Sequence, residues 1–403
     1  MTKNPMITTQ GRTALLLMAA AMTSPLCVAG GFSDEEPVTP VVMEQQSSSD
    51  WRDWVSATIS GSLRYDDNIF LQEEDEESDL IASLAPTLSI ANSEDATNQW
   101  SFDYTPAARF YFDNSDLDSL DHDVNAKYAK RLPKTSFDAH AYYSLASGSN
   151  RYVSGYIDST NYGLKSNVSH SLSGKTRLDA NFVYDVNEFD ASNIFDRTKY
   201  FLRLGGVYQV TGKINVGPYV SYENIDVVGG VDHEAYGAGA KFEYQATGKT
   251  LLTGFFGWEN REFNGDNGDD RNAFVYEVGA THQYTAKTRF SGAIYRNSQP
   301  SYSSGLEGFE TTGINFRTDY QYSEKLNFFG LAAFEVTDYY ATQSGGTSED
   351  RDADYYYIRV GGDYRFNEDW TFGASALYRE NGADSSIYDY ENFQFLVNAT
   401  YEF

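Results

Sequence analysis

The chain has 403 residues, with 58 Asp and Glu against 30 Lys and Arg, which gives a formal net charge of −28. Nucleic-acid binding requires a basic surface, and so acidic a composition argues against that class of partner. Tyr, Phe and Gly are abundant, at 32, 26 and 33 residues. Together with a negative mean hydropathy, this favours β-structure with one apolar and one wet face.

The N-terminal segment has the order of a secretory signal peptide. Basic residues precede an apolar run over residues 14–22, and small residues follow it up to Ala29. This order is typical of export signals, and the run is too short to cross a bilayer as a helix. We therefore expect a signal peptide over residues 1–29, which contains the single cysteine, Cys27. Lipidation of Cys27 is the alternative, although the residue before it suits a lipoprotein signal poorly.

Residues 30–53 are acidic and polar, with two prolines and a serine run, and predict a flexible linker. From residue 54 onward, apolar residues recur at every second position. Successive side chains of a strand point to opposite faces, so each such segment has one apolar and one polar face. Segments of at least about 10 residues are long enough to cross a bilayer as tilted strands. The alternation is clearest over residues 393–403.

Short turns recur at intervals of about 40 residues, and longer acidic loops lie halfway between them. Each period therefore reads as strand, loop, strand, turn. Short turns on one side and longer loops on the other are typical of outer-membrane barrels. The turns are Pro133–Thr135, Ser173–Thr176, Thr211–Ile214, Thr247–Thr250, Thr285–Thr288, Ser323–Leu326 and Asn367–Asp369.

These patterns predict an all-β fold: a single transmembrane antiparallel up-and-down β-barrel over residues 54–403. Counting from a first strand at Val55–Tyr65 to a last strand at Asn392–Phe403 gives about 18 strands, with 16 as the alternative count. An even count puts both barrel ends on one side, which we expect to be the periplasm of a Gram-negative bacterium. A β-propeller also repeats near 40 residues, but it needs four short strands per repeat.

The last strand ends in an alternating aromatic pattern at Tyr401 and Phe403. A terminal aromatic residue after such a strand resembles the assembly signal of bacterial outer-membrane barrels. The resemblance implies that outer-membrane lipid and the barrel-assembly machinery are partners.

The histidines do not suggest an enzyme. His122 and His233 are each followed by an acidic residue, Asp123 and Glu234. An acid–histidine pair can activate water or a serine, but adjacent residues of a strand point to opposite faces. We therefore predict no catalytic site and no cofactor.

Two acidic runs, residues 73–77 and 266–270, contain oxygen ligands of the kind that calcium prefers. Neither run shows the spacing of a known calcium loop with a distal bidentate glutamate. A charge run is usually a solvated loop, so we predict no metal site.

The alternation also assigns a set of charged residues to the lumen, because lipid-facing Arg or Lys costs about 2–4 kcal/mol at mid-membrane. Glu277 and Tyr219 fall on the same face. Pairing that only stabilises the wall is an equally good role for these residues. The pore-lining candidates are Arg64, Arg109, Lys127, Arg131, Arg203, Lys241, Arg317, Arg359, Arg365, Asp319 and Asp363.

Barrels of 16–18 strands leave an aqueous channel. The linker is too short to form a plug domain, and no loop is longer than about 15 residues. We therefore expect a wide lumen without a deep constriction loop, either open or closed by a partner protein.

One short motif suggests a family. Tyr65-Asp66-Asp67-Asn68 ends the first strand, and Leu84–Ser89 follows on the next. This start resembles the outer-membrane β-barrels encoded in exopolysaccharide operons, the β-barrel porin 2 group. The resemblance implies an 18-stranded channel for secreted polysaccharide, with a periplasmic polysaccharide export protein and an inner-membrane copolymerase as partners. It supplies no catalytic residues. A diffusion porin for small solutes and a non-transporting surface barrel are the alternatives.

Overall fold

The computed structural model describes residues 54–92, 97–152, 155–191, 194–264, 270–301, 306–341 and 352–403, which belong to a compact unit over residues 41–403. The predicted signal peptide (1–29) and linker (30–53) lie outside the described residues.

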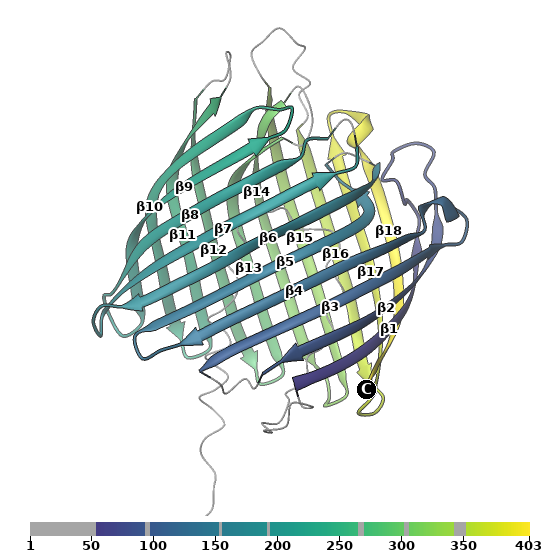
Figure 1. Cartoon of the computed structure of the whole chain (residues 1–403), viewed down its shortest axis with the longest axis horizontal. Coiled ribbons are helices and arrows are strands. Elements are labelled where there is room, and N and C mark those ends of the chain that lie inside the picture. Colours follow the sequence, from purple (N-terminus) through teal and green to yellow (C-terminus); the bar gives the residue numbers. More distant parts are fainter. Residues whose placement is uncertain are drawn as a thin grey trace, which may run out of the picture. The chain divides into compact units, whose positions relative to one another are not determined.

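The described residues form one 18-stranded antiparallel sheet that closes on itself (Figure 1). Two short 3-10 helices, η3 (Ser115–Leu117) and η4 (Ser386–Tyr388), lie in connections between strands. The strands are β1 (Val55–Asp66), β2 (Asp79–Ala91), β3 (Asn98–Tyr111), β4 (Ser119–Arg131), β5 (Thr135–Asn150), β6 (Gly155–Ser171), β7 (Thr176–Phe189), β8 (Arg197–Gln209), β9 (Ile214–Val227), β10 (Asp232–Thr247), β11 (Thr250–Asn264), β12 (Arg271–Thr285), β13 (Thr288–Pro300), β14 (Leu306–Gln321), β15 (Leu326–Ala341), β16 (Ala353–Arg365), β17 (Trp370–Ala383) and β18 (Tyr390–Glu402).

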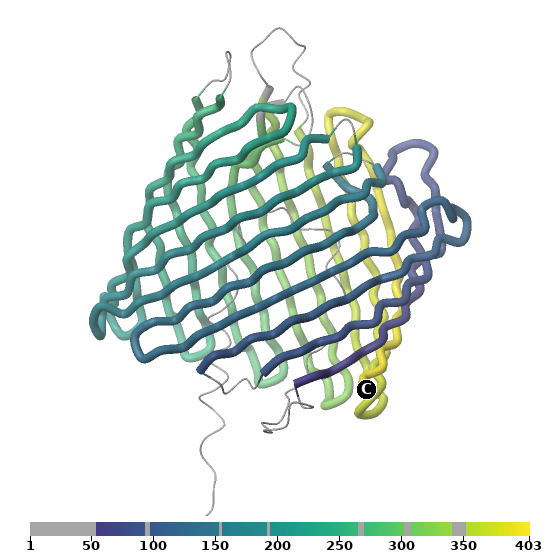
Figure 2. Tube along the Cα trace, viewed as in Figure 1, coloured from purple at the N-terminus to yellow at the C-terminus, as the bar shows by residue number. Residues whose placement is uncertain are grey.

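Every strand pairs with its neighbours in sequence, and β1 also pairs with β18. The closing register runs from Thr58 opposite Glu402 to Asp66 opposite Gln394. Figure 2 shows the trace winding once around the barrel until its yellow end lies beside its purple start. The predicted 18-stranded up-and-down barrel is confirmed. The predicted bounds of the first and last strands differ from the observed ones by one or two residues.

The outer face of the barrel is apolar. On β1, Leu63 and Tyr65 are each 44% exposed and point outward, so Arg64 between them points inward. Aromatic side chains form two outward belts. Tyr356 and Tyr364 of β16 are outward members eight residues apart, which is about 26 Å along the strand and about 20 Å along an axis tilted by about 40°. This height approaches the apolar band of roughly 25 Å of a membrane-spanning barrel.

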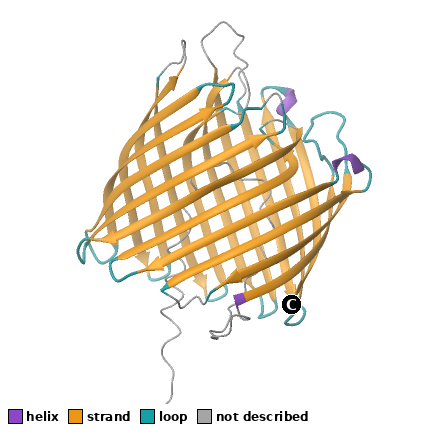
Figure 3. Cartoon of the chain, in the orientation of Figure 1, coloured by secondary structure: helices purple, strands orange, loops and turns teal. Residues whose placement is uncertain are grey.

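The short turns predicted from the repeat all lie at one end, called here the turn end, and the longer connections lie at the loop end (Figure 3). A hydroxyl or amide side chain begins most of these turns. In one of them, Thr211 Oγ1 accepts hydrogen bonds from the backbone N–H groups of Lys213 and Ile214, both at 3.1 Å. Ser173, Ser323 and Asn367 do the same in their own turns.

The lysines that recur in these turns form hydrogen bonds to the neighbouring turns. The Nζ atoms of Lys249, Lys287 and Lys325 donate to the carbonyl oxygens of Tyr284, Tyr322 and Phe366, at 3.3, 3.1 and 3.0 Å. Each lysine therefore reaches the neighbouring turn, so the repeated sequence links adjacent hairpins along the turn end.

In the part of the chain that the structure describes, no helix is both long and apolar enough to cross a membrane.

Candidate functional site

The hairpin of β5 and β6 leaves the wall at the loop end. The β4–β5 pairing ends at His122 opposite Leu145, and the β6–β7 pairing ends at Ser159 opposite Phe189. β5 and β6 nevertheless remain paired with each other up to Asn150 opposite Gly155. The last part of this hairpin has therefore lost both of its neighbours.

The freed part of the hairpin bends into the lumen. Tyr156 occupies an outward position of β6, yet its ring lies 6.0 Å from the inward-facing Tyr111 of β3. Ser149 Oγ donates to the carbonyl oxygen of Ile69, in the connection between β1 and β2. The outward face of the hairpin thus packs on the inner face of the neighbouring wall.

The tip of the β5–β6 hairpin reaches the opposite wall. Arg151 Nη2 lies 2.6 Å from Glu335 Oε2 on β15, and both side chains are buried, at 6% and 1% exposed. The Arg151 guanidinium also lies 4.1 Å from the ring centre of Tyr355 on β16, and Tyr152 stacks on Phe309 of β14 at 5.7 Å. β6 and β15 are nine places apart in a closed 18-stranded sheet. These contacts therefore cross the lumen, and we call them the bridge.

The opposite wall also leans inward. The β12–β13 pairing ends at Tyr276 opposite Arg296, although β13 continues to Pro300 beside β14. Beyond Arg296, towards the loop end, the Ser298 carbonyl accepts a hydrogen bond of 2.8 Å from Arg261 on the inner face of β11.

Tyr340 of β15 extends this contact. Its hydroxyl lies 3.1 Å from Ser298 Oγ, and its ring lies 6.1 Å from that of Phe263, another inward residue of β11. The loop-end parts of β13 to β15 therefore cover the inner face of β11. One side of the bridge is thus the freed β5–β6 hairpin, and the other is a paired part of the wall that leans inward.

Arg261 is surrounded by buried charges. It lies 3.1 Å from Glu223 and 3.2 Å from Glu259, and Lys199 lies 2.6 Å from Glu223. A buried charge is tolerated only when it is paired and hydrogen-bonded. This cluster fixes the guanidinium that holds the β13 backbone.

Packing at the bridge is tight. A cavity of about 10 Å³ lies between Arg151, Tyr152, Thr337 and Tyr355, which is room for about one water molecule. The sequence predicted no deep constriction loop, and it did not predict that a strand hairpin would narrow the lumen. The loops are as short as expected, and it is the strand hairpins that narrow the lumen.

The sequence carries a signal for the bridge in the outward positions of the two walls. The outward positions near the β5–β6 tip are Ser147, Ser149 and Asp158, which lipid would not accommodate. The equivalent positions on β13 include Arg296 and Ser298. Loss of the apolar outward face marks where each hairpin leaves the membrane wall.

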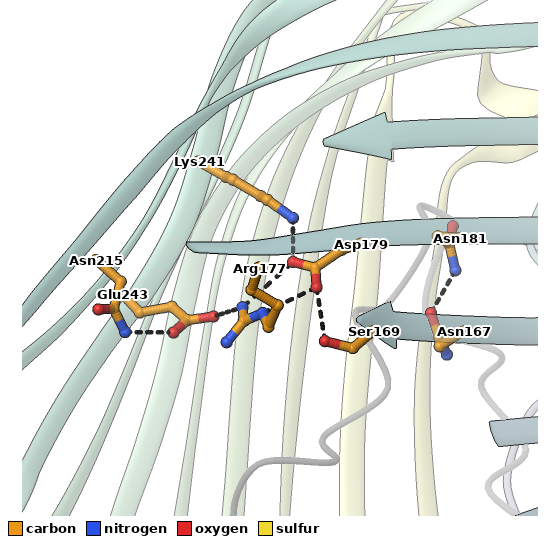
Figure 4. A network of polar contacts seen from close by, with 8 residues as sticks. All are labelled: Asn167, Ser169, Arg177, Asp179, Asn181, Asn215, Lys241 and Glu243. Atoms are coloured by element: carbon orange, nitrogen blue, oxygen red, sulfur yellow. Dashed lines mark hydrogen bonds and ion pairs between the residues drawn. The ribbon is translucent and has the colours of Figure 1, made fainter. Parts of the chain in front are cut away.

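Towards the turn end the inner wall is polar and paired (Figure 4). Asp179 accepts hydrogen bonds from Arg177 Nε at 2.8 Å, Lys241 Nζ at 2.5 Å and Ser169 Oγ at 2.8 Å. Arg177 also donates to Glu243 at 2.5 Å. The network joins β6, β7 and β10 and contains both signs of charge.

The predicted lumen residues all occupy inward positions, and many form ion pairs, across strands or, for Arg317 and Asp319, within β14. The closest ion-pair distances are 3.0 Å for Arg109–Asp121, 2.5 Å for Arg131–Asp138, 2.5 Å for Lys241–Asp179 and 2.9 Å for Arg317–Asp319. Arg359 lies 3.4 Å from Ser375 Oγ and 5.8 Å from the ring centre of Phe329. Arg64, Lys127, Arg365 and Asp363 share the inward face of their strands. Arg203 differs, because its contacts are with aromatic rings.

The Tyr65–Asn68 motif closes the barrel. Asn392 Nδ2, on β18, donates to Asp66 Oδ1 at 2.7 Å and to Asp67 Oδ1 at 3.1 Å. Asn68 Nδ2 donates to the Glu391 carbonyl at 2.9 Å. Three of the four motif residues therefore join the first strand to the last, while Tyr65 faces outward.

The acid next to each rim histidine points to the other face, as expected. The His122 ring lies outward beside Tyr104, and its Nδ1 is 3.0 Å from the tyrosine hydroxyl. His233 faces inward, 3.1 Å from Arg261. Glu234, in contrast, accepts a hydrogen bond from the hydroxyl of the outward-facing Tyr236. Residues 265–269, which hold most of the second acidic run, lie outside the described residues. Among those described, no group of three metal-ligating side chains occurs.

Tyr401 and Phe403, the predicted assembly signal, lie at the turn end. Their ring centres are 4.8 Å apart, and Tyr401 also contacts Trp370 at 5.0 Å. Phe403 is 77% exposed. Its role in assembly stays a prediction.

A closed antiparallel barrel with an apolar outer band and a polar inner wall defines an outer-membrane-type β-barrel protein. No family model and no curated protein matches the chain. Solved structures with a similar fold include OccAB3 of Acinetobacter baumannii, at 13% identity over 87% of this chain and 99% of that one, with a TM-score of 0.45.

Two Pseudomonas aeruginosa barrels are also similar. OccK3 (OpdO) is 11% identical over 87% of this chain and 95% of its own, with a TM-score of 0.45. OccK2 (OpdF), solved in complex with glucuronate, is 11% identical over 86% and 97%, with a TM-score of 0.47.

Proposed function

We propose that this protein is a diffusion channel for small polar solutes in the outer membrane of a Gram-negative bacterium, with the turn end and both barrel termini in the periplasm. The observation that carries the proposal is the bridge. A polar inner wall runs along the barrel, and the contacts of Arg151 and Tyr152 with the opposite wall narrow it at the loop end. Such a lumen admits small hydrated solutes and selects against large ones. The proposal assigns the protein no catalytic activity.

The bridge also supports gating. Its contacts join the β5–β6 tip, which has lost pairing with both neighbouring strands, to residues of β14, β15 and β16 that remain paired in the wall. The tip can therefore move away from the opposite wall without breaking the rest of the sheet. When the bridge contacts are formed, they narrow the lumen. When they separate, the lumen becomes wider at the loop end.

The experiment is reconstitution of the protein in planar bilayers and in liposomes. We expect discrete current steps, and liposome swelling with a monosaccharide that falls sharply for a tetrasaccharide. A Tyr152→Cys, Phe309→Cys variant joined by a short bis-maleimide should conduct less than the same variant left unlinked. Absence of current and of swelling in folded protein would refute the channel proposal.

Polysaccharide secretion with a periplasmic export protein is the second candidate, and the Tyr65–Asn68 resemblance favours it. However, Asp66, Asp67 and Asn68 have a complete structural role in closing the barrel, which requires no polysaccharide. A gene deletion tests both candidates. Slower solute uptake with unchanged surface polysaccharide supports the diffusion channel, whereas polysaccharide trapped in the periplasm supports secretion.

A further inference from the structure

We propose that the inner wall between β8 and β12 binds small zwitterionic solutes, with Arg203 holding the carboxylate and Glu277 the ammonium group. The inference rests on the proposed function, because it names the class of solute that the channel takes.

Arg203 lies midway along β8 and is surrounded by aromatic rings. Its guanidinium carbon is 4.2 Å from the ring centre of Phe255, 4.8 Å from Tyr219 and 5.1 Å from Phe201. Within the described ranges it forms no ion pair and no hydrogen bond, in contrast to the inward-facing Lys241 and its carboxylate partner at 2.5 Å. The Nε of Arg203 is buried without a hydrogen-bond partner among the described residues. Stacking uses the faces of the guanidinium and leaves its two terminal Nη groups to bind a carboxylate through two parallel hydrogen bonds.

Glu277 supplies the opposite charge. It lies midway along β12, directly across from Phe255 in the β11–β12 register, so the two Cβ atoms are roughly 5 Å apart. Its carboxylate has no hydrogen bond or ion pair to any described residue, but it is close enough to Arg203 for an electrostatic interaction. Arg203 and Glu277 are therefore two opposite charges beside the same ring, and neither forms a hydrogen bond or a close ion pair with a described residue (strands in Figure 1).

Glycines make the arrangement possible. A Cβ at Gly257 would overlap the Tyr219 hydroxyl, and one at Gly239 would lie 2.8 Å from Tyr219 Cε1. Without these side chains Tyr219 can lie along the wall, where Arg203 stacks on it. The Tyr219 hydroxyl is buried and has no hydrogen-bond partner among the described residues.

This arrangement favours a zwitterion over a singly charged solute. A carboxylate on Arg203 and an ammonium on Glu277 satisfy both charges at once, and an apolar side chain can pack against Phe255. A solute with one charge leaves the other protein group unpaired, and hydrogen bonds to charged groups are the stronger ones.

Equilibrium dialysis of the full-length protein in detergent tests the site with three probes of similar shape: phenylalanine, 3-phenylpropionate and 2-phenylethylamine. We expect phenylalanine to bind about tenfold more tightly than either of the other two. Arg203→Gln should remove the preference for phenylalanine over 2-phenylethylamine, and Glu277→Gln the preference over 3-phenylpropionate. Arg317→Gln, at an inward arginine paired with Asp319, is the matched control and should change nothing.

Equal binding of the three probes, or variants that weaken all three alike, would overturn the inference. Bilayer currents separate its failure from that of the channel proposal. Ion conduction without a zwitterion preference refutes the site alone. If the protein shows the expected binding pattern but passes neither current nor solute, the channel proposal is refuted and the binding-site proposal stands.

Discussion

Removal of the Arg151 side chain should open the loop end of the channel. The Arg151→Ala variant leaves the Glu335 carboxylate 1% exposed and without its cation, although Tyr295 still donates a hydrogen bond to it. Loss of one partner of a buried ion pair costs about 3–5 kcal/mol. The bridged state bears that cost, whereas in an unbridged state Glu335 can reach water.

The expected change in conductance follows from the lower end of this energy range. A change of about 3 kcal/mol shifts the ratio of bridged to unbridged molecules about 100-fold, because each 1.4 kcal/mol is a factor of ten. Single-channel recording should show a larger mean conductance and a larger fraction of time in the widest state. Swelling rates with a tetrasaccharide should rise in parallel.

Two further variants test the reasoning. In Arg151→Ala combined with Glu335→Leu no buried charge is left unpaired, so the double variant should return part of the way towards wild type. Arg317→Ala breaks a pair whose side chains are both 42% exposed, and should change the stability by no more than about 1 kcal/mol. If Arg151→Ala is folded and conducts like wild type, the bridge does not restrict the pore.

Three predictions concern stability, measured as the temperature at which folded barrel is lost in heat-modifiability gels. Asn392→Ala should destabilise the barrel by about 2–4 kcal/mol, because it removes buried hydrogen bonds to Asp66 and Asp67 from the closing pair of strands; an unchanged transition would contradict the assigned role of the motif. Thr211→Ala should cost about 1 kcal/mol, since two turn N–H groups lose their acceptor, while Thr211→Ser should retain most of the stability. Burial raises the pKa of Asp67 above its ordinary 3.8, so its protonation favours the folded state, and its contribution to stability should grow as the pH falls from 7 through the raised pKa towards 3.8. Asp67→Asn should lack that increment, and identical pH profiles for the two proteins would show that Asp67 does not titrate on folding.

Local sequence patterns determined the barrel. Alternation fixes which face of each strand meets lipid, because a one-residue shift would expose every charge to it. In several turns a Ser, Thr or Asn side chain accepts hydrogen bonds from the N–H groups two and three residues further on, so the turn spacing could be predicted without any tertiary contact. The inward positions of Arg203, Lys241 and Glu277 followed from the same period of two.

What lies opposite those side chains could not be read from the sequence. Arg151 and Glu335 are 184 residues apart, and no period connects them. They meet because the β5–β6 hairpin leaves the wall and crosses a space that exists only once the sheet has closed. The partners of Asp66 and Asp67 lie more than 320 residues away on the last strand, so the motif shows its role only in the closed barrel. Likewise, Arg203 stands apart from the paired lumen arginines because closure places rings beside it and no carboxylate within ion-pair distance among the described residues. Strand formation depends on neighbours two residues away, whereas the bridge and the proposed site depend on distances across the lumen, which the closed tertiary structure sets.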